Sequence, residues 1–424
     1  MRVNALSKEG GIKQHWSTPD RLPHRWMWLW DSCYHSLAIS LLPLPPNVTA
    51  GSLTGPQQSV TVSFEYLHSV LAAAAADGAI SIERTPDNTG TQVDQTQPPL
   101  LAWATADNYD QCLIHFGNRS KVCTDMLVYA YPRLEGYLEW DIRERSDPSG
   151  ATPLLVWTKG TESGMDNSQR FDACGGAHGT ACSDMLSVDF SVFLAKEAEH
   201  MVAIAAALGN ATGKAWWTAI KVSVTKAVHT ELWDEDRGMY FDVLLKPNKR
   251  FSPVLAVSSL LPLWLDDMPA GRLPKILAVL RDPTKFGTVV PLPSVARDTP
   301  TFSTDMWRVR EGGGEEEDVP CRRCFYGLEW ACNPSDQQFT GRRYRPRTSC
   351  AAGFGIRPFG MQPVPFLRSV PLDDSPANKG PDVLLGWHAP RQTYHDDTPV
   401  LHPVPPPLLT PIPSACEHCR AGAI

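Results

Sequence analysis

The chain has 424 residues, a mass of 46.7 kDa and a formal net charge of −7, with 42% hydrophobic and 20% charged residues. This composition fits a folded globular protein with room for one large domain or two smaller ones, and it is too apolar for disorder throughout. The acidic balance excludes a general nucleic-acid-binding surface. No apolar run approaches the ~18–20 residues of a membrane helix, because the prolines of 43–46 end the best candidate, so neither nucleic acid nor membrane is an expected partner.

The cysteines do not form the dense pattern of a small disulfide-rich domain, since they are an odd number, 11, spread over a long chain. The pairs Cys321/Cys324 and Cys416/Cys419 have C-x-x-C spacing, but their separation of ~90 residues far exceeds the ~15–20 of a zinc ribbon. Incidental thiols are the favoured interpretation, although pairing in space would allow zinc. We therefore predict no metal site.

The N-terminal segment 1–16 has no apolar run of the kind found in a secretory signal, and a cytoplasmic location is the first expectation. Asparagines 47, 118 and 210 each begin an Asn-x-Ser/Thr sequence that is compatible with glycosylation. Without a leader these sequences indicate little.

Apolar residues recur at helical spacing in consecutive segments of the first 308 residues, and the strand signal is weak. In chain order the predicted helices are 60–76, 100–112, 126–143, 188–208, 215–232, 255–265 and 273–280. Pro132 is expected to kink the third helix or to shift its start. Residues 238–244 predict a short hairpin after the turn at 234–237. Paired helices over ~300 residues are typical of an all-α solenoid or a closed α/α toroid, and periodicity alone does not choose between them.

The composition changes after residue 308. Of the 38 prolines, 17 lie in 309–424, which begins with a Gly- and Glu-rich stretch at 311–318 and ends with a proline-rich stretch at 402–413. We interpret 1–308 as the folded domain and 309–424 as a largely irregular tail.

The most informative segment for chemistry is 157–172, which places Glu162, Asp166 and Arg170 among small residues. Glycoside hydrolysis needs one carboxylic acid to protonate the leaving oxygen and a second carboxylate to activate water or to attack. From composition alone, an ordinary loop with capping carboxylates and an arginine paired to an aspartate is the favoured interpretation of the same residues.

Three further segments hold aromatic and polar side chains in combinations that suit sugar binding. They are 25–35 with three tryptophans and Asp31, 95–103 with Gln97 and Trp103, and 302–308 with Trp307 and Arg308. Aromatic faces stack on sugar rings, but indoles also fill cores and amides also cap helices. Motifs for phosphate loops, dinucleotide binding, serine hydrolysis and zinc proteolysis are absent from the sequence.

Taken in order, five segments resemble glycoside hydrolase family 63 and its mannosylglycerate-hydrolase-like relatives, over about residues 15–308. The matching stretches are RWMWLWDSCYH (25–35), TQPPLLAWA (96–104), ESGMDNSQRFD (162–172), LWDEDRGMYFD (232–242) and TPTFSTDMWR (299–308). The resemblance implies an (α/α)6 toroid, incomplete at its C-terminal side, with the active site in the central funnel.

By this resemblance Asp166 matches the general acid of an inverting α-glycosidase that acts on a small or terminal α-mannosyl or α-glucosyl substrate. The positions that line the sugar site by the same match are Trp30, Asp31, Gln97, Gly164, Trp307 and Arg308. No cofactor is required, and the expected partner is a carbohydrate bound by a monomer. Relatives in the endoplasmic reticulum offer a second expectation for localisation.

After Arg308 the sequence departs from the family pattern. A further helix pair is expected there before the general-base motif, and this chain instead enters its Gly- and Glu-rich stretch. A degenerate counterpart of the motif, within a remnant near 325–355, makes Glu329 the candidate base. The alternative is a sugar-binding pseudoenzyme that lacks a positioned base.

Overall fold

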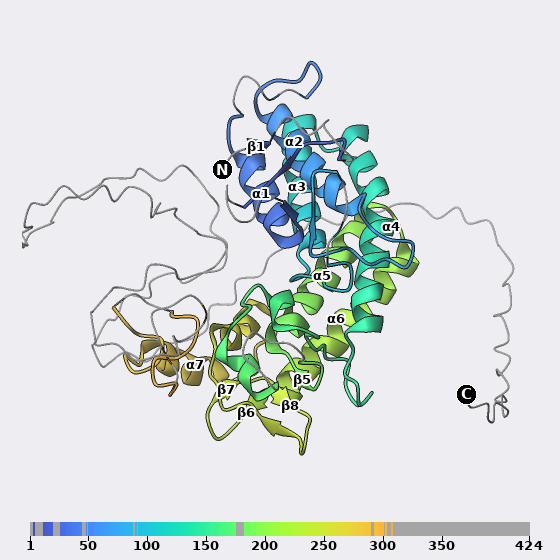
Figure 1. The fold of residues 1–424 in the computed structure, drawn as a ribbon. Helices are drawn as coiled ribbons and strands as arrows, with labels where there is room; N and C mark the ends of the chain where they lie inside the picture. The colour runs from blue at the N-terminus through green and yellow to red at the C-terminus, as the bar shows by residue number, and fades with distance from the viewer. Residues whose placement is uncertain are drawn as a thin grey trace, which may run out of the picture. The chain divides into compact units, whose positions relative to one another are not determined.

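The computed structural model describes residues 12–19, 26–44, 48, 50–87, 90, 92–174, 182–289, 292–300, 302 and 307, with the backbone of 3–4 (Figure 1). All of these fall in one compact unit, residues 1–338. The predicted tail 309–424, including the degenerate remnant near 325–355 and both C-x-x-C pairs, lies outside the described residues.

Helices dominate the described part of the chain, as the sequence predicts. The α-helices are α1 (Leu29–Leu41), α2 (Gly55–Leu71), α3 (Leu101–Phe116), α4 (Lys121–Glu144), α5 (Val188–Ala207), α6 (Ala211–Glu231) and α7 (Arg272–Arg281). The 3-10 helices are η1 (Gly160–Ser163), η2 (Gln169–Cys174) and η3 (Val257–Trp264). The predicted helix 255–265 is therefore a 3-10 helix, and it contains Pro262, whose ring and missing N–H disfavour an α-helical interior. Pro132 lies inside α4, which begins earlier than predicted and continues past the proline.

The strands are two-residue pieces that join neighbouring loops. They are β1 (Val3–Asn4), β2 (Trp16–Ser17), β3 (Met27–Trp28), β4 (Glu83–Arg84), β5 (Met185–Leu186), β6 (Trp233–Asp234), β7 (Met239–Tyr240), β8 (Val243–Leu244) and β9 (Arg250–Phe251). Antiparallel pairs form between β1 and β2, β3 and β4, and β6 and β7, and β8 lies between β5 and β9. The predicted hairpin within 238–244 is not formed, because β7 and β8 do not pair with each other; β7 instead pairs with β6, which precedes the turn.

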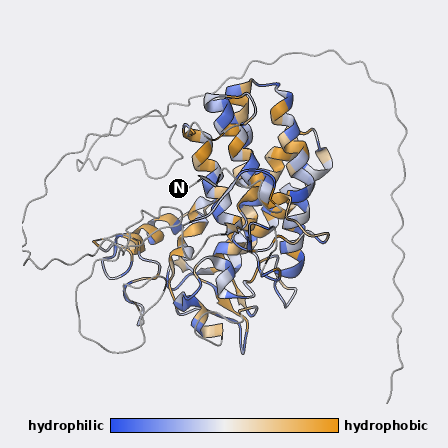
Figure 2. Cartoon of the chain, turned by 45° about the horizontal axis from the view of Figure 1, so that its top comes forward, coloured by the Kyte–Doolittle hydropathy of each residue, from blue (hydrophilic) through white to orange (hydrophobic). Residues whose placement is uncertain are grey.

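Successive helices pack as hairpins arranged in two layers. The pairs α1–α2, α3–α4 and α5–α6 are each in contact, while α3 also contacts α1 and α5, and α2 also contacts α4 (Figure 1). Figure 2 shows apolar and polar faces on these helices, as layered amphipathic helices require. The odd-numbered helices α1, α3 and α5 therefore form one layer, with the even-numbered helices packed against it.

Serines allow close approach at the α1–α2 contact. Ser36 and Ser63 are buried, their hydroxyl oxygens lie 3.0 Å apart, and Nδ2 of Asn108 on α3 donates to Oγ of Ser36 over 2.6 Å. Because buried polar groups cost free energy unless they are paired, this network fixes three helices in one register.

Two disulfides that the sequence analysis did not predict are present. Cys112 of α3 is bonded to Cys123 of α4, and Cys174 at the end of η2 is bonded to Cys182. Cys33 is a buried free thiol within the described residues. Spacing alone could not show these pairs, since each depends on how a loop folds back.

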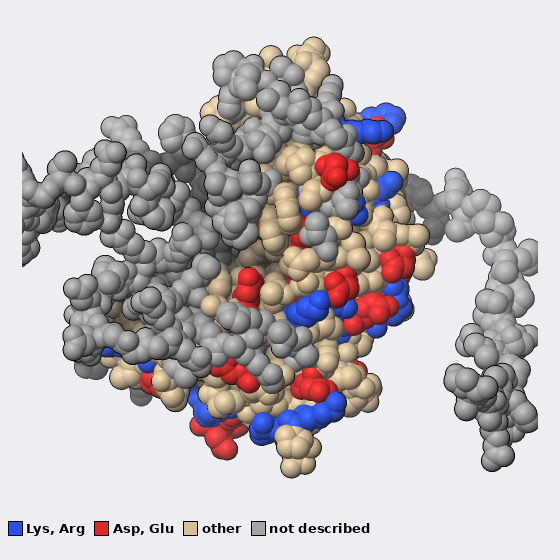
Figure 3. All heavy atoms as spheres, in the orientation of Figure 1, with Lys and Arg blue, Asp and Glu red and all other residues tan. Residues whose placement is uncertain are grey.

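None of the described helices is both long and apolar enough to span a bilayer. Basic and acidic side chains alternate on the face shown in Figure 3.

Candidate active site

The tryptophan segment 26–30 changes from strand to helix in its middle. Trp28 lies in β3, opposite Glu83 of β4, and α1 begins one residue later at Leu29. The three indoles therefore do not share a helix, and Trp30 lies in the first turn of α1. Asp31 lies in the same turn and is half-buried, where a carboxylate is favoured by the helix dipole.

Gln97 holds the start of this helix. Its side-chain Oε1 accepts a hydrogen bond of 3.1 Å from the backbone N–H of Trp30, and the side chain is buried. Capping was one of the two roles considered for this amide. It caps α1, however, and not the adjacent helix α3, because the fold places Gln97 next to the backbone of Trp30.

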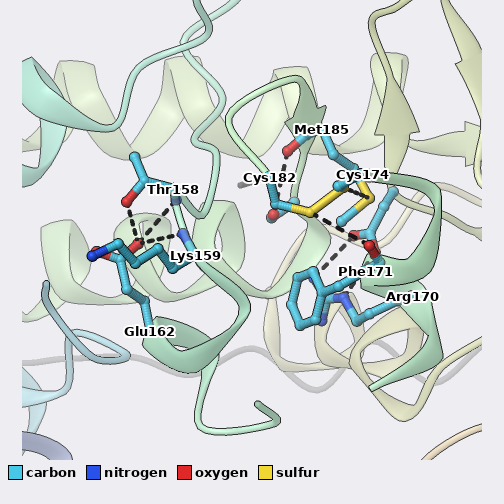
Figure 4. Close-up of a disulfide and its surroundings, with 10 residues drawn as sticks. Thr158, Lys159, Glu162, Arg170, Phe171, Cys174, Cys182 and Met185 are labelled. Atoms are coloured by element: carbon cyan, nitrogen blue, oxygen red, sulfur yellow. Dashed lines mark hydrogen bonds and ion pairs between the residues drawn. A yellow bond between two sulfur atoms is a disulfide. The ribbon is translucent and has the colours of Figure 1, made fainter. Parts of the chain in front are cut away.

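Glu162 anchors the first part of the segment 157–174. Its buried carboxylate accepts hydrogen bonds from the backbone and hydroxyl of Thr158 at 2.9 and 2.8 Å (Figure 4). It also accepts one from the backbone of Thr96 at 3.2 Å. Arg145 donates to the same carboxylate over 2.6 Å. A buried carboxylate with this many donors is a structural group that ties the segment to the C-terminal end of α4 and to Thr96.

Position 164 requires glycine for two reasons, its backbone conformation and the side chain packed against it. Its φ is +71°, a left-handed value that ends η1, and a Cβ placed there would lie 2.5 Å from the Trp30 ring. The structure thus brings together Trp30, Gln97 and Gly164, three of the residues that the sequence predicts for the sugar site.

Replacing Gly164 with alanine is expected to displace the Trp30 ring and to lower sugar binding more than folding alone would explain. The matched control is Gly150→Ala, since Gly150 has a similar φ of +66° with no atom within 4 Å of an added Cβ. Both variants carry the same backbone cost, of order 1 kcal/mol. Near-ultraviolet circular dichroism and sugar affinity should change in Gly164→Ala only. Equal changes in the two variants would show that contact with Trp30 is unimportant.

Asp166 follows two residues after Gly164 and is exposed to solvent. It lies in a turn closed by a hydrogen bond of 2.9 Å from the backbone N–H of Ser168 to the carbonyl of Met165. The candidate acid therefore lies at the surface, between the buried residues Met165 and Ser168.

Arg170 anchors the second part of the segment. Its fully buried guanidinium donates to both carboxylate oxygens of Asp189 at 2.7 and 2.8 Å, and its Nε lies 2.9 Å from Asp242. Asp189 also accepts from the indole N–H of Trp157 over 2.9 Å. Burial raises the pKa of Asp242, with a further contribution from Asp189, while Arg170 opposes both. The segment is therefore held at this end by a bidentate buried ion pair.

The disulfide Cys174–Cys182 closes the chain just beyond this anchor. The backbone N–H of Cys182 donates to the carbonyl of Thr158 over 2.9 Å, so the two ends of the segment lie together. The residues between the two cysteines, 175–181, lie outside the described residues.

Half-buried aromatic side chains form a continuous row from Trp30 on α1 through α3 to η3. The Trp30 ring meets Tyr34 with centroids 5.8 Å apart, Tyr34 meets Trp103 at 6.1 Å, and Trp103 meets Trp264 at 5.5 Å, all edge-to-face. We call these four residues the aromatic row. It links α1, α3 and η3, and its first member is the ring that covers Gly164.

Glu197 of α5 supplies the missing cap of α3. Its buried carboxylate accepts from the backbone N–H groups of Ala102 and Trp103 at 2.6 and 2.8 Å. Burial raises the pKa of Glu197 to about 7, although these two hydrogen bonds oppose the rise. The position of Trp103 in the aromatic row thus depends on a residue 94 positions away.

This burial predicts a pH-dependent stability. Because the pKa of Glu197 is higher in the folded than in the unfolded chain, its contribution is complete below about pH 4.5 and is lost as pH rises through about 7. A tenfold difference in proton affinity between the folded and unfolded chain corresponds to ~1.4 kcal/mol of unfolding free energy. Because glutamine does not titrate, the unfolding free energy of Glu197→Gln should decrease less than that of wild type as pH rises through this window. Urea denaturation at several pH values measures the slope.

The control is Glu199→Gln on the same helix. Although burial opposes it, hydrogen bonds from Lys196 and Lys221 lower the pKa of Glu199, so its titration falls below the window. This variant should keep the wild-type slope between pH 5 and 7. A flattened slope in Glu199→Gln, or an unchanged one in Glu197→Gln, would contradict the assignment.

The remaining predicted site residues are only partly described. Trp307 is half-buried with a φ of +59°, whereas Arg308 and the candidate base Glu329 lie outside the described residues. Among the described residues, no cluster of three His, Cys, Asp or Glu side chains could hold a metal ion.

Comparison with solved structures shows the fold. The chain is similar to an uncharacterized conserved protein from Thermus thermophilus, with a TM-score of 0.57, 19% identity, and coverage of 72% of this chain and 81% of that one. It is also similar to the GH63 mannosylglycerate hydrolase from Thermus thermophilus in complex with glucose, with a TM-score of 0.56, 18% identity, and coverage of 72% and 81%. The architecture is therefore the (α/α)6 toroid of glycoside hydrolases, as the resemblance implied.

The family follows from the sequence match. The model of the mannosylglycerate hydrolase MGH1-like glycoside hydrolase domain matches residues 24–332, and the chain belongs to this family. Human trehalase is 34% identical over 149 residues, 32% of this chain and 24% of the trehalase. The trehalase of Oryctolagus cuniculus is 31% identical over 161 residues, 35% of this chain and 26% of the enzyme. The chain thus matches about a quarter of the length of these relatives.

Proposed function

We propose that this glycoside hydrolase cleaves an α-glucosyl or α-mannosyl bond in a small or terminal substrate with inversion at the anomeric carbon. The observation that carries the proposal is the segment 157–174, in which an exposed carboxylate, Asp166, lies between two buried anchors, Glu162 and Arg170. Holding an acid on a fixed loop is what proton transfer in a bound complex requires.

Asp166 is the general acid in this proposal. It gives its proton to the glycosidic oxygen as the bond to the anomeric carbon breaks, which lets the leaving group depart as a neutral alcohol. Glu162 is not the second catalytic group, because its carboxylate is buried and fully engaged by Thr96, Thr158 and Arg145.

Glu329 is the proposed general base. In an inverting enzyme the two carboxyl groups lie ~6.5–9.5 Å apart, so that one water fits between the base and the anomeric carbon. The base removes a proton from that water as it attacks the face opposite the leaving group.

Sugar binding is assigned to the residues around Trp30. Its half-buried ring offers a face for stacking, Asp31 follows it in the first turn of α1, and Gln97 binds the same turn through Oε1, which leaves its amide NH2 to contact a hydroxyl. Gly164, Trp307 and Arg308 complete the proposed lining. Aromatic stacking with a few polar groups is the usual composition of a small-ligand site.

The substrate class rests on the relatives. Two are named trehalases and one solved neighbour is named a mannosylglycerate hydrolase, so the candidates share a small leaving group on an α-linked hexose. We therefore propose trehalose, mannosylglycerate and glucosylglycerate as the first substrates to test.

The test is hydrolysis of this panel by the full chain, followed by proton NMR of the first anomer released. The expected result is turnover of at least one substrate with the β-anomer appearing first. An α-anomer appearing first would overturn inversion. Sugar binding without turnover would instead support the pseudoenzyme alternative.

A further inference from the structure

The connection between α3 and α4 combines a covalent closure with an open surface. Cys112 and Cys123 are fully buried and bonded to each other across a sequence separation of 11, and the residues between them include the loop 117–120. Gly117, Asn118 and Arg119 are exposed, and a Cβ added at Gly117 would meet no atom within 4 Å. The loop is thus fixed at its base and unobstructed at its tip.

Asn118-Arg119-Ser120 in this loop is an N-glycosylation sequence. Ser120 occupies the N-cap position of α4, where a serine hydroxyl usually accepts a hydrogen bond from the helix, yet its side chain makes no capping bond. The hydroxyl that the modification requires is therefore not used by the helix.

Asn210 offers an internal contrast. It begins the sequence Asn210-Ala211-Thr212, but its Oδ1 accepts a hydrogen bond of 2.9 Å from the backbone of Gly213 as the N-cap of α6. The side chain is half-buried, and a Cβ at Gly213 would approach both Nδ2 of Asn210 and the hydroxyl of Tyr131. A sugar on this nitrogen would compete with the first turn of α6.

The disulfides indicate where such a modification takes place. Two separate pairs, Cys112–Cys123 and Cys174–Cys182, are formed in the described part of the chain. Structural disulfides persist in oxidising compartments and are rare where thiol reductants are abundant. The same compartments contain the machinery that modifies Asn-x-Ser/Thr sequences.

We propose that this chain matures in an oxidising compartment of the secretory route, where Asn118 receives an N-linked oligosaccharide. This favours the second of the two expectations for localisation over the cytoplasmic one. In forming each disulfide, two thiols lose two electrons and two protons to a disulfide oxidant, which becomes a dithiol. In the glycosylation step, Nδ2 of Asn118 bonds to the anomeric carbon of a diphosphate-activated oligosaccharide, the diphosphate leaves, and the transferase base takes the Nδ2 proton.

The first experiment uses the full chain secreted from a eukaryotic host behind a cleavable signal, as wild type, Asn118→Gln, Ser120→Ala and Asn210→Gln. Electrophoretic mass is compared before and after enzymatic removal of N-linked glycans. Asn118→Gln and Ser120→Ala should each lose one glycan-sized step, while Asn210→Gln keeps the wild-type pattern. A wild-type mass retained by Asn118→Gln would overturn the site.

The second experiment uses the chain isolated from its native cells, denatured without reductant in the presence of an alkylating reagent and analysed by peptide mass spectrometry. The expected result is a disulfide-linked pair of peptides holding Cys112 and Cys123, with Asn118 converted to aspartate by deglycosylation. Alkylated Cys112 and Cys123 next to an unmodified Asn118 would overturn the proposed compartment.

Discussion

Replacing Asp166 with asparagine is expected to lower turnover by ~10²–10⁴-fold, because the amide keeps the size of the carboxyl group but has no proton to give to the leaving oxygen. The thermal midpoint should stay unchanged, since Asp166 is exposed and the anchors of its segment are untouched. Measuring kcat, KM and the thermal midpoint on one preparation separates the catalytic effect from the structural one.

The matched control is Asp172→Asn, an exposed carboxylate in the same segment, which should keep kcat within a few fold of wild type. A substrate with a very acidic leaving group, such as a nitrophenol, should restore much of the lost rate in Asp166→Asn because it departs without protonation. Wild-type kcat in Asp166→Asn would remove Asp166 from the mechanism.

Replacing Arg170 with methionine is expected to lower the free energy of unfolding by ~3–5 kcal/mol. Methionine fills a similar volume, but it leaves the buried carboxylates of Asp189 and Asp242 without their shared cation. Urea denaturation of both proteins at pH 7 measures the difference.

The control for this prediction is Arg143→Met, since Arg143 pairs with Glu144 at the surface, where both side chains are about half exposed. Its unfolding free energy should remain within ~0.5 kcal/mol of wild type. Similar losses of unfolding free energy in the two variants would contradict the conclusion that Arg170 stabilises the fold through its buried ion pairs.

The helix hairpins were predictable because their signal is local. Residues 188–208 and 215–232 repeat apolar side chains at helical spacing around a glycine-containing link, and α5 and α6 form there with ends shifted by a few residues. The importance of 157–172 was also predictable, since carboxylates and an arginine in a loop of small residues need partners.

The partners themselves were not predictable, because the chain brings them from far away. Arg170 pairs with Asp189 and Asp242, which are 19 and 72 residues distant, whereas a local interpretation would pair it with Asp172. Glu197 caps a helix 94 residues earlier. Periodicity gives the faces of helices, but it does not specify which polar group closes each buried end.

The double anchoring of 157–174 also separates two kinds of residue in one short stretch. Glu162, Gly164 and Arg170 are needed for folding, since two form buried ion pairs and the third has no room for a side chain. Nearly any replacement at these positions should disturb the loop. Asp166 and its neighbour Asn167 lie between Gly164 and Arg170 in the sequence and are less buried. Mutational tolerance is therefore uneven within a single loop, and new leaving-group preferences could evolve at its tip while the fold that supports it stays constant.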